Sequence, residues 1–507
     1  MNKERHVVVI GAGIGGLTAG SLLLKAGYKV TVLEAHVYPG GCAGTFEHKK
    51  YRFDAGATLA GGFTPGGPHY QLAQMLELEW PIRPVDPAWV VHLPDGRSVA
   101  QWASQSDWEA ERIKAFPDAE RFWKKQEMLA DISWDVSTRP FPWPPESIED
   151  LWTLTTSMRP KTFRSLPYLL RTIGSLAPKN DPMFKTFLDA QLLISAQATG
   201  DEANALYGSA AFDLPRRGVN HVHGGIGSLA DTLVDWIREN GGEVLFGQEA
   251  TGIEVKDGRV VAVTTKRKLH IPCDFVCANL TPWSLRNLLG DDAPAKLARD
   301  VDERLAPTWG AFMIYLGIDK ETFLKKYPGA ATHHQIVLDH TKPLGETNSI
   351  FFSMSELDDE TRAPKGKVPV TMSTHTDISQ WWRLREASRE AYKERKARYL
   401  EAMLDGIENV FPGLRDAISY QIAGTPVSFQ RFTRRPLGMV GGFPQKSILA
   451  ARGPKTGIEN LLFVGDSIFP GQSTAGVTLG GMRVAAQVQK YLRRNKSIIP
   501  VPQAEMA

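Results

Sequence analysis

Two glycine-rich segments lie at opposite ends of this chain, and they constrain its fold more than any other feature. The first, VVVIGAGIGGLTAG, spans residues 7–20, and the second, NLLFVGDSIFPGQSTAGVTLGG, spans residues 460–481. Each begins with a short apolar run typical of a buried parallel strand and passes through glycines into a helix-like run. A nucleotide-binding unit ordinarily completes its site within one βαβ run. The pairing therefore predicts one site assembled from both ends, with the middle of the chain inserted between its halves.

The N-terminal segment has the order of elements that phosphate binding requires. A predicted strand over residues 6–10 is followed by Gly11, Gly13 and Gly16 in GxGxxG spacing, and then by a predicted helix over residues 17–26. The first glycine makes the tight turn, the second lets the backbone approach a pyrophosphate, and the third lets helix pack on strand. The N–H groups at the start of the helix then face the phosphates. We expect a dinucleotide site here, where the alternative is a generic glycine turn.

The residues after the next strand distinguish FAD from NAD. A predicted strand over residues 29–33 ends at Glu34, whose carboxylate can accept hydrogen bonds from ribose hydroxyls and would repel the extra phosphate of NADP. Gly40 and Gly41 follow closely, and two adjacent glycines let the chain run flat past the ribityl and diphosphate portion of a larger cofactor. The sequence therefore predicts FAD as the cofactor.

The C-terminal segment repeats the strand–turn–helix pattern. A predicted strand over residues 461–464 precedes Asp466, which is placed to accept hydrogen bonds from ribityl hydroxyls, and a helix is predicted over residues 478–492. The N-terminus of that helix can stabilise negative charge on a reduced isoalloxazine ring. In the middle of the chain, Ala250 holds a position where a strand crossing can offer backbone atoms to adenine. The predicted cofactor-binding residues are Gly11, Gly13, Ile14, Gly15, Gly16, Glu34, Ala35, Gly40, Gly41, Cys42, Ala43, Gly44, Thr45, Ala250, Gly465, Asp466, Gly476, Val477 and Thr478.

Five segments give the chain a resemblance to a known family. They are GAGIGGLTAG, GGCAGTFEHKKYRFDAGAT, HGGIGSLADTL, GTPVSFQRFTRRPLGMVGG and VGDSIFPGQSTAGVTLGG. With them the chain resembles the FAD-dependent carotenoid desaturases and carotenoid isomerases related to bacterial phytoene desaturase. The stretch FLDAQLLISAQATGDEANALYG at residues 187–208 looks most like the cyanobacterial carotenoid 3',4'-desaturase branch, with the isomerases close behind.

The fold expected on this basis is α/β. A Rossmann-like FAD-binding domain of the amine oxidase-like type is expected from residues 1–75, 220–300 and 450–507. A mixed α/β substrate domain with a helical cap is expected from residues 76–219 and 301–449.

The resemblance implies that the enzyme removes a hydride and a proton from adjacent carbons of a hydrophobic polyene. The flavin would accept the hydride, with a quinone or oxygen as a possible final electron acceptor. Candidate substrate-contacting residues are Phe429, Arg431, Phe432 and Phe469. No side chain stands out as a catalytic base. A redox-neutral carotenoid cis–trans isomerase is the first alternative, and an amine oxidase-like oxidoreductase or a non-enzymatic lipid-binding relative comes after it.

Composition excludes several other classes. The 507 residues carry a net charge of +3, which gives no support to a nucleic-acid partner. Three cysteines and no signal-peptide pattern favour a reducing, cytoplasmic compartment. His333, His334 and His340 have no carboxylate or cysteine at ligand spacing nearby, so no metal is predicted.

One segment nevertheless suggests contact with a membrane surface. Residues 158–179 interleave basic side chains with large apolar ones, and the prolines at 160 and 167 break the segment into short helices. Such a pattern suits an anionic membrane surface, and we expect peripheral membrane association through it. The alternative is a core helix with a solvated face.

Overall fold

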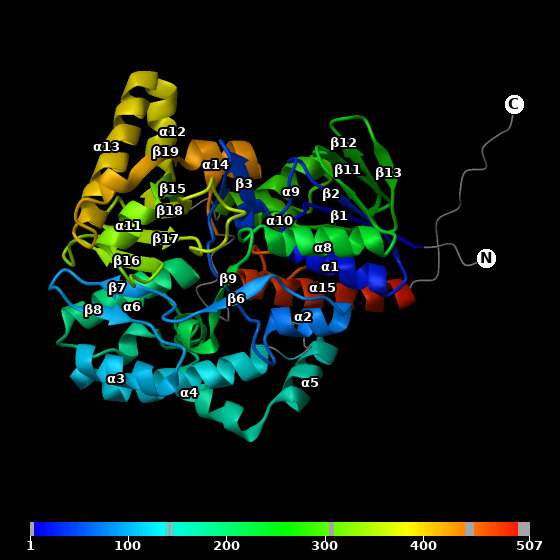
Figure 1. Ribbon diagram of the computed structural model, residues 1–507. Coiled ribbons are helices and arrows are strands. Elements are labelled where there is room, and N and C mark those ends of the chain that lie inside the picture. Colours follow the sequence, from blue (N-terminus) through cyan, green and yellow to red (C-terminus); the bar gives the residue numbers. More distant parts are fainter. Residues whose placement is uncertain are drawn as a thin grey trace, which may run out of the picture.

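The computed structural model describes residues 5–137, 139, 143–145, 147–303, 309–441 and 451–494. Its nucleotide-type part is a five-stranded parallel sheet in the order β10-β2-β1-β14-β20 (Figure 1). The strands come from the beginning, middle and end of the chain, so the sheet is complete only when all three regions have folded together. They are β1 (His6–Ile10), β2 (Lys29–Leu33), β10 (Glu243–Leu245), β14 (Phe275–Ala278) and β20 (Leu461–Phe463).

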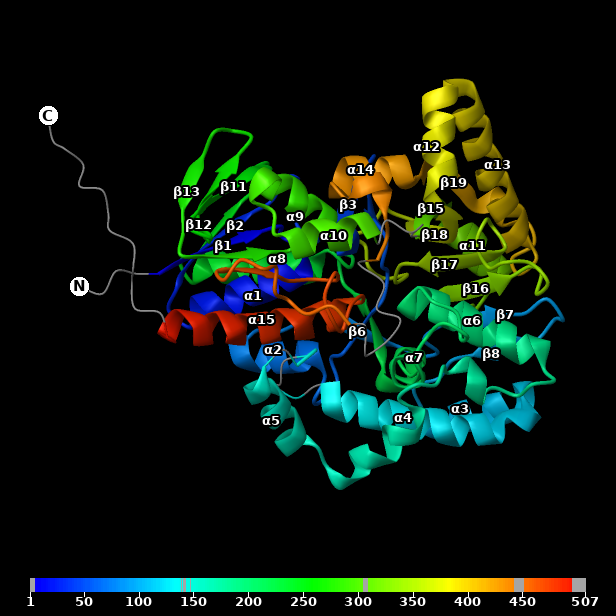
Figure 2. The same ribbon diagram turned by 180° about the vertical axis from the view of Figure 1, so that it is seen from behind.

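Three helices lie side by side against this parallel sheet, as Figures 1 and 2 show: α1 (Ile14–Lys25), α8 (Ser228–Glu239) and α15 (Thr474–Arg494). The glycines of the two terminal segments allow α1 and α15 to pack closely. A Cβ atom at Gly481 would lie 2.6 Å from the carbonyl oxygen of Gly15, so only glycine fits at this contact. The two segments from opposite ends of the sequence thus meet helix to helix.

A three-stranded antiparallel sheet extends this part of the molecule. The turn that joins its first two strands is formed by Asp257 and Gly258, whose φ values are 51° and 72°. Positive φ at both central residues is the conformation that Asp-Gly hairpins adopt, as the sequence predicts. The elements of this region are β11 (Ala250–Lys256), β12 (Arg259–Thr265), β13 (His270–Pro272), α9 (Pro282–Leu289) and α10 (Ala295–Glu303).

A seven-stranded sheet forms the second large part of the molecule, in the order β19-β15-β18-β17-β16-β7-β8. The pair β16–β7 is parallel and the other pairs are antiparallel, so the sheet is mixed. Helices cover one of its faces (Figure 1). The elements are β7 (Val90–His92), β8 (Ser98–Ala100), β15 (Trp309–Asp319), β16 (His333–Val337), β17 (Ser349–Met354), β18 (Lys367–Asp377), β19 (Ile418–Gly424), α11 (Lys320–Lys326), α12 (Ile378–Ala387) and α13 (Arg389–Glu408).

The side chains of β15 alternate between the two faces of this sheet. Phe312, Ile314 and Leu316 are fully buried in the core against the covering helices. Because successive side chains on a strand point to opposite faces, Met313 and Tyr315 lie on the other face. That face turns toward the parallel sheet and lines the cavity described below.

A helical layer lies beneath the seven-stranded sheet and has an aromatic core that includes Phe122, Trp123 and Phe184. Its helices are α3 (Gln105–Ala115), α4 (Glu120–Ser137), α5 (Ile148–Ser157), α6 (Pro182–Ala196) and α7 (Ala205–Phe212), with a 3₁₀ segment η3 (Pro160–Tyr168). The connecting elements are α2 (Pro68–Leu76), α14 (Pro426–Thr433), β3 (Thr45–His48), β4 (Tyr51–Asp54), β5 (Ala60–Gly61), β6 (Ile82–Val85) and β9 (Val219–Val222). The mixed sheet and the helical layer agree with the predicted fold class.

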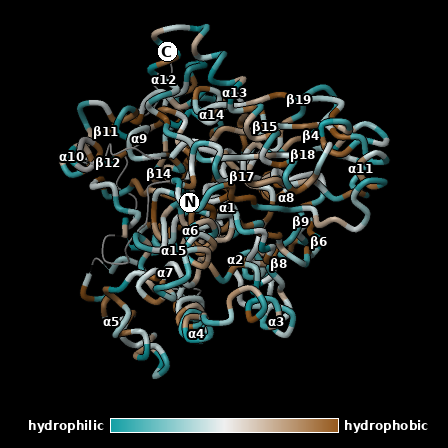
Figure 3. The backbone as a smooth tube through the Cα atoms, turned by 90° about the vertical axis from the view of Figure 1, so that its left-hand side faces the viewer, coloured by the Kyte–Doolittle hydropathy of each residue, from teal (hydrophilic) through white to brown (hydrophobic). Residues whose placement is uncertain are grey.

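Among the described helices, none is both long enough and apolar enough to cross a bilayer. Apolar stretches gather mainly inside the molecule, but α5 stands away from the body and still carries apolar residues (Figure 3).

Candidate functional site

One cavity of about 1720 Å³ joins the two large parts of the molecule. It begins at the glycine turn after β1 and extends to the open face of the seven-stranded sheet, where Met313 and Tyr315 form part of its wall. Pockets for single small molecules measure roughly 300–1,000 Å³. The cavity therefore has room for a dinucleotide and a second large ligand in continuous space.

The glycine turn after β1 forms the floor of the nucleotide end. Gly11 has a φ of 101°, which favours glycine, and its N–H donates to the carbonyl oxygen of Leu33 at 2.7 Å. A Cβ atom at Gly16 would lie 2.4 Å from the Gly11 carbonyl oxygen, so Gly16 permits the packing of helix on turn that the sequence predicts. Ile14 and Gly15, in the first turn of α1, line the cavity. Their position leaves the N-terminus of α1 facing a space where phosphates can bind.

Glu34 is held in a fixed orientation at the end of β2. One carboxylate oxygen accepts a hydrogen bond from the Ala12 N–H at 2.8 Å, and the other accepts from the His36 N–H at 2.8 Å. Burial raises the pKa of Glu34, and the backbone hydrogen bonds counteract part of that effect. A carboxylate oxygen can accept more than one hydrogen bond, so both remain able to receive ribose hydroxyls. Ala35 and Ala250 line the same end of the cavity.

Residues 40–45 divide between cavity wall and structural support. Gly40 donates its N–H to the Ala12 carbonyl oxygen at 2.9 Å and adopts a φ of 102°. Gly40, Gly41, Cys42 and Ala43 line the cavity, whereas Gly44 and Thr45 do not. The Thr45 hydroxyl donates to Asp54 at 2.8 Å and accepts from the Gly227 N–H at 2.8 Å. Burial raises the pKa of the Cys42 thiol, and the Arg435 guanidinium counteracts part of that effect.

The C-terminal segment also contributes only part of its predicted residues to the wall. Asp466 and Val477 line the cavity, while Gly465, Gly476 and Thr478 lie behind it. Thr478 is fully buried, with its hydroxyl 3.4 Å from Nδ1 of His69. These residues support the wall rather than forming it.

Among the cavity residues that the sequence did not predict, two lie beside predicted cofactor-binding residues. Asn279 follows β14, and its side-chain amide donates to the Gly11 carbonyl oxygen at 3.2 Å. A Cβ atom at Gly13 would lie 2.6 Å from this amide, so Gly13 makes room for Asn279 as well as for any phosphate. Its position directly after a buried strand was the available signal. Arg435 is the second missed residue, and it lines the cavity beside Asp466, which strongly raises the pKa of its guanidinium.

Aromatic and aliphatic side chains dominate the sheet end of the cavity. Phe429, from α14, is buried in a cluster with Met313 and Tyr315. The Tyr315 hydroxyl donates to the Ala55 carbonyl oxygen at 2.8 Å, which fixes the ring, and burial raises its pKa. Phe351, from β17, adds a further aromatic surface. This end of the cavity suits a long apolar ligand.

The other predicted substrate residues lie elsewhere. Arg431 and Phe432 line the cavity, but the Phe432 ring is 5.9 Å from that of His36, beside the nucleotide end. Phe469 does not line the cavity; its ring is 6.1 Å from that of Trp143. Of the four candidates, the structure thus brings Phe429 alone to the apolar sheet face.

A hydrogen-bonded network of buried amides closes the far end of the cavity. Gln191, from α6, accepts a hydrogen bond from the Trp89 indole N–H at 2.7 Å and one from the Gln101 amide. Its own amide donates to Gln335, on β16, at 2.5 Å. Since every partner is satisfied, the network joins the helical layer to the sheet at little cost in desolvation.

The histidines that the sequence singled out as a superficial metal pattern have other partners. His333 hydrogen-bonds with the Ser353 hydroxyl at 2.6 Å, and His334 hydrogen-bonds with His92 at 2.9 Å. His340 belongs to no group of potential metal ligands in the described part of the chain.

The nucleotide end meets the requirements of FAD. The turn admits only glycine at its close approaches, and Glu34 is held in position for a ribose. The buried Nη1 of Arg435 has no hydrogen-bond partner in the described part of the chain. An unsatisfied buried guanidinium nitrogen is costly unless a ligand supplies an acceptor. The donor set therefore suits a phosphate-bearing, oxygen-rich cofactor.

Curated relatives extend over almost the whole chain. Prolycopene isomerase 2 of an Oncidium hybrid cultivar is 29% identical over 96% of this chain and 84% of its own length. The prolycopene isomerase of Arabidopsis thaliana is 28% identical over 95% and 82%. The neurosporene-forming phytoene desaturase of Rhodobacter capsulatus is 24% identical over 95% and 94%. The predicted resemblance to carotenoid desaturases and isomerases is confirmed.

Solved structures share the fold. An oxidoreductase from Methanosarcina mazei superposes with a TM-score of 0.63 at 20% identity, covering 95% of this chain and all of the other. Cyclohexylamine oxidase from Brevibacterium oxydans gives 0.60 at 15% identity, covering 97% and 100%. The model of the flavin containing amine oxidoreductase family matches residues 14–489, which confirms the predicted FAD cofactor and an oxidoreductase enzyme. The chain belongs to the flavin containing amine oxidoreductase family.

Proposed function

We propose that this protein is a FAD-dependent carotenoid desaturase, which introduces a carbon–carbon double bond into a polyene. The observation that carries the proposal is the continuity of the cavity from the glycine turn to the apolar face of the seven-stranded sheet. A rod-like hydrocarbon that enters along this face would bring its end against a cofactor held at the turn. The relatives that act on carotenoids support this substrate class.

The proposed cofactor contacts follow from the wall of the nucleotide end. Backbone N–H groups of Ile14 and Gly15 would bind the diphosphate, Glu34 the adenosine ribose, and Ala250 the adenine. When bound, FAD supplies a hydride acceptor for desaturation, and a quinone or oxygen would remove the electrons afterwards. Arg435 would carry positive charge at the cofactor in either redox state.

The protein would orient the polyene and exclude water from it. Phe429 and Met313 supply apolar surface, and Tyr315 is locked by its hydrogen bond to the main chain, so the wall changes shape little on binding. A fixed apolar wall holds the reacting carbons near one position relative to the flavin. Holding two reactants in a fixed geometry lowers the entropic part of the reaction barrier.

The second candidate is a redox-neutral carotenoid cis–trans isomerase, which is favoured by the 28–29% identity to prolycopene isomerases. The two activities are separated by pigment analysis after expression in cells that make different carotenoids. Desaturase activity lengthens the chromophore and removes two hydrogens, whereas isomerase activity changes geometry at constant mass. If no carotenoid changes in cells that contain the flavin-loaded protein, both candidates are wrong.

We further propose peripheral membrane contact through an apolar arm, defined as residues 147–171, which comprises α5, η3 and the residues around them. Its large side chains are exposed: Trp152 is 70% exposed, Phe163 57% and Leu170 83%. Arg159 and Lys161 lie on the same arm, with side chains 62% and 46% exposed. Exposed apolar groups interleaved with cations suit an anionic lipid surface, where a carotenoid substrate would dissolve.

Different ranges of the chain would bind the cofactor and the substrate. We propose that residues 1–75, 220–300 and 450–507 serve as the FAD-binding domain, and that residues 76–219 and 301–449 serve as the substrate domain. The composition of the two large sheets supports this division, because all five strands of the parallel sheet lie in the first set and all seven of the mixed sheet lie in the second.

A further inference from the structure

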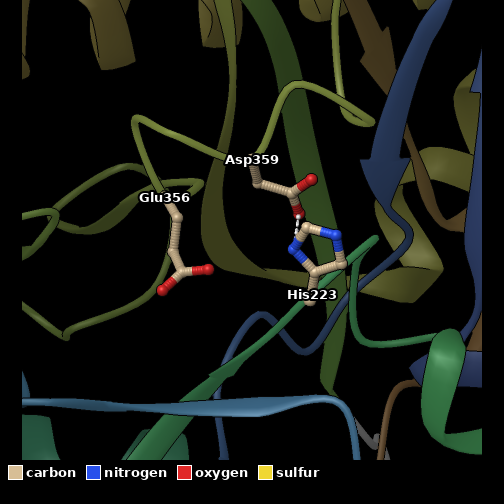
Figure 4. Close-up of side chains that lie close together, drawn as sticks. All are labelled: His223, Glu356 and Asp359. Atoms are coloured by element: carbon tan, nitrogen blue, oxygen red, sulfur yellow. Dashed lines mark ion pairs between the residues drawn. The ribbon is translucent and has the colours of Figure 1, made fainter.

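We propose that His223, Ser355, Glu356 and Asp359 form a binding site for a divalent transition-metal cation, outside the cofactor and substrate cavity. The His223 imidazole and the two carboxylates offer ligand atoms that lie within 4.8 Å of one another. Figure 4 shows the Asp359 carboxylate directed at the imidazole, with the Glu356 carboxylate approaching from the side. One imidazole and two carboxylates form a common set of ligands for such a cation.

Ser355 supplies an independent indication of a missing ligand. Its side chain is only 8% exposed, and its hydroxyl has no hydrogen-bond partner among the residues that the structure describes. Ser355, Glu356 and Asp359 line the same small pocket, which measures about 10 Å³ and has polar walls. A space of roughly 10–15 Å³ holds one water-sized occupant. The pocket therefore fits a single ion bound by the Glu356 and Asp359 carboxylates, and the His223 imidazole reaches the same carboxylates from outside the pocket lining. We infer that such an ion would also satisfy the Ser355 hydroxyl.

The local charge favours a cation. Three carboxylates line the pocket, those of Asp54, Glu356 and Asp359, together with one guanidinium group, that of Arg362. Arg362 pairs with Asp54 at 3.0 Å. Arg83 lies 2.6 Å from Asp358 and 3.4 Å from Glu356.

Asp359 is therefore left with no guanidinium of its own, and its ion-pair partner is the His223 imidazole at 3.5 Å.

The position of the site suggests what a bound ion would do. His223 follows β9 and directly precedes the loop into α8, and Asp359 accepts the Gly224 N–H at 2.7 Å from the loop between β17 and β18. A cation would thus join the nucleotide part of the molecule to the seven-stranded sheet. Thr58 lines both this pocket and the large cavity, so the site would brace one wall of that cavity.

Zn²⁺ and Mn²⁺ are suitable probes, because imidazole nitrogen and carboxylate oxygen ligands bind both. The flavin-loaded full-length protein is freed of metal with a chelator and then titrated with Zn²⁺ by calorimetry and with Mn²⁺ by electron paramagnetic resonance. One saturable site is expected. Absence of saturable uptake of either ion overturns the proposal.

Matched variants separate a metal site from a surface ion pair. His223→Gln and Glu356→Gln should each weaken Zn²⁺ binding at least tenfold, because each removes a ligand. His270→Gln is the control, since exposed His270 faces one carboxylate, Glu254, at 3.1 Å and should leave binding unchanged. Equal affinity in wild type and both ligand variants overturns the proposal.

Ser355→Ala is a variant of the site that is expected to fold, so it tests metal binding even if the other variants do not fold. Removing an unpartnered buried hydroxyl should leave the metal-free thermal midpoint unchanged or higher, while Zn²⁺ affinity falls several-fold. Unchanged Zn²⁺ affinity in this folded variant contradicts the site as described. Because metal binding is measured without any carotenoid, its failure leaves the proposed desaturase activity unaffected.

Discussion

Arg435 donates a hydrogen bond from Nη2 to Oδ2 of Asp466 at 2.5 Å, and both side chains line the cavity. The Arg435 side chain is 17% exposed and that of Asp466 is 19% exposed. The sequence predicts that Asp466 accepts hydrogen bonds from ribityl hydroxyls. It gives no sign that the Asp466 carboxylate also accepts a hydrogen bond from Arg435. The pair ties the segment after α14 to the C-terminal glycine turn, so it holds two sides of the cofactor end together.

Replacing Asp466 by asparagine should destabilise the flavin-free protein by about 3 kcal/mol, because the mostly buried Arg435 guanidinium loses its counter-charge. Urea unfolding measures the change. Arg434→Gln is the matched control: Arg434 lies 3.3 Å from Glu249 with its side chain 51% exposed, and its loss should cost under about 1 kcal/mol. Equal effects of the two substitutions would show that the Arg435–Asp466 pair contributes no more to stability than the exposed Arg434–Glu249 pair.

Gly16→Ala should prevent FAD binding, whereas Gly20→Ala should not. A Cβ atom at position 16 would lie 2.4 Å from the Gly11 carbonyl oxygen, and this backbone cannot move without opening the turn. At position 20, on the same helix, the nearest atoms are 3.6 Å away, and alanine gains up to about 1 kcal/mol in helix propensity. Flavin absorbance of the purified variants and FAD titration measure the outcome. Normal flavin content in Gly16→Ala would contradict the described turn.

Stability should fall as the pH drops below 6.5, partly through His69. Burial lowers the pKa of His69 from 6.5 to about 3. Between pH 6.5 and pH 3, His69 is therefore protonated in the unfolded chain but neutral in the folded chain. The contribution of neutral His69 is complete above pH 6.5 and decreases by about 1.4 kcal/mol for each pH unit below it, until about pH 3. His69→Phe should reduce the slope of the unfolding free energy against pH by the amount that corresponds to one proton. Urea unfolding at a series of pH values measures this slope.

Leu170→Asp should reduce binding to anionic vesicles several-fold. Leu170 is 83% exposed on the apolar arm, and a carboxylate there removes apolar area and adds repulsion. Ile113→Asp, on α3, is the control, because Ile113 is 63% exposed but lies outside the arm. Co-sedimentation with phosphatidylserine-containing vesicles measures binding, which should also weaken with added salt. Equal loss in both variants would argue against the arm as the contact surface.

Much of the nucleotide part could be predicted from sequence because its signals are local. The strand, Gly11, Gly16 and Glu34 follow one another within 30 residues, and each has a backbone requirement that few other residues meet. The Asp257–Gly258 turn was predictable for the same reason, since both residues tolerate positive φ.

The rest of the site depends on contacts between distant segments. Asn279 directly follows a buried strand, but only the folded structure shows that it supports the turn at Gly11, 268 residues away. Phe469 follows a cofactor motif, yet its ring packs near Trp143 outside the cavity. The cluster at His223 is assembled from the loop before α8 and the loop after β17, so ligand spacing along the sequence could not reveal it.

The proposed desaturase requires that a flavin at the glycine turn reacts with a polyene lying along the seven-stranded sheet. The direct test is anaerobic titration of the oxidised, flavin-loaded protein with single carotenoids, monitored by flavin absorbance and followed by mass analysis of the pigment. For a desaturase, we expect that one carotenoid bleaches the flavin stoichiometrically and yields a product lacking two hydrogens. An unchanged flavin spectrum with every carotenoid tested, together with pigments of unchanged mass and geometry after prior reduction of the flavin, would contradict it.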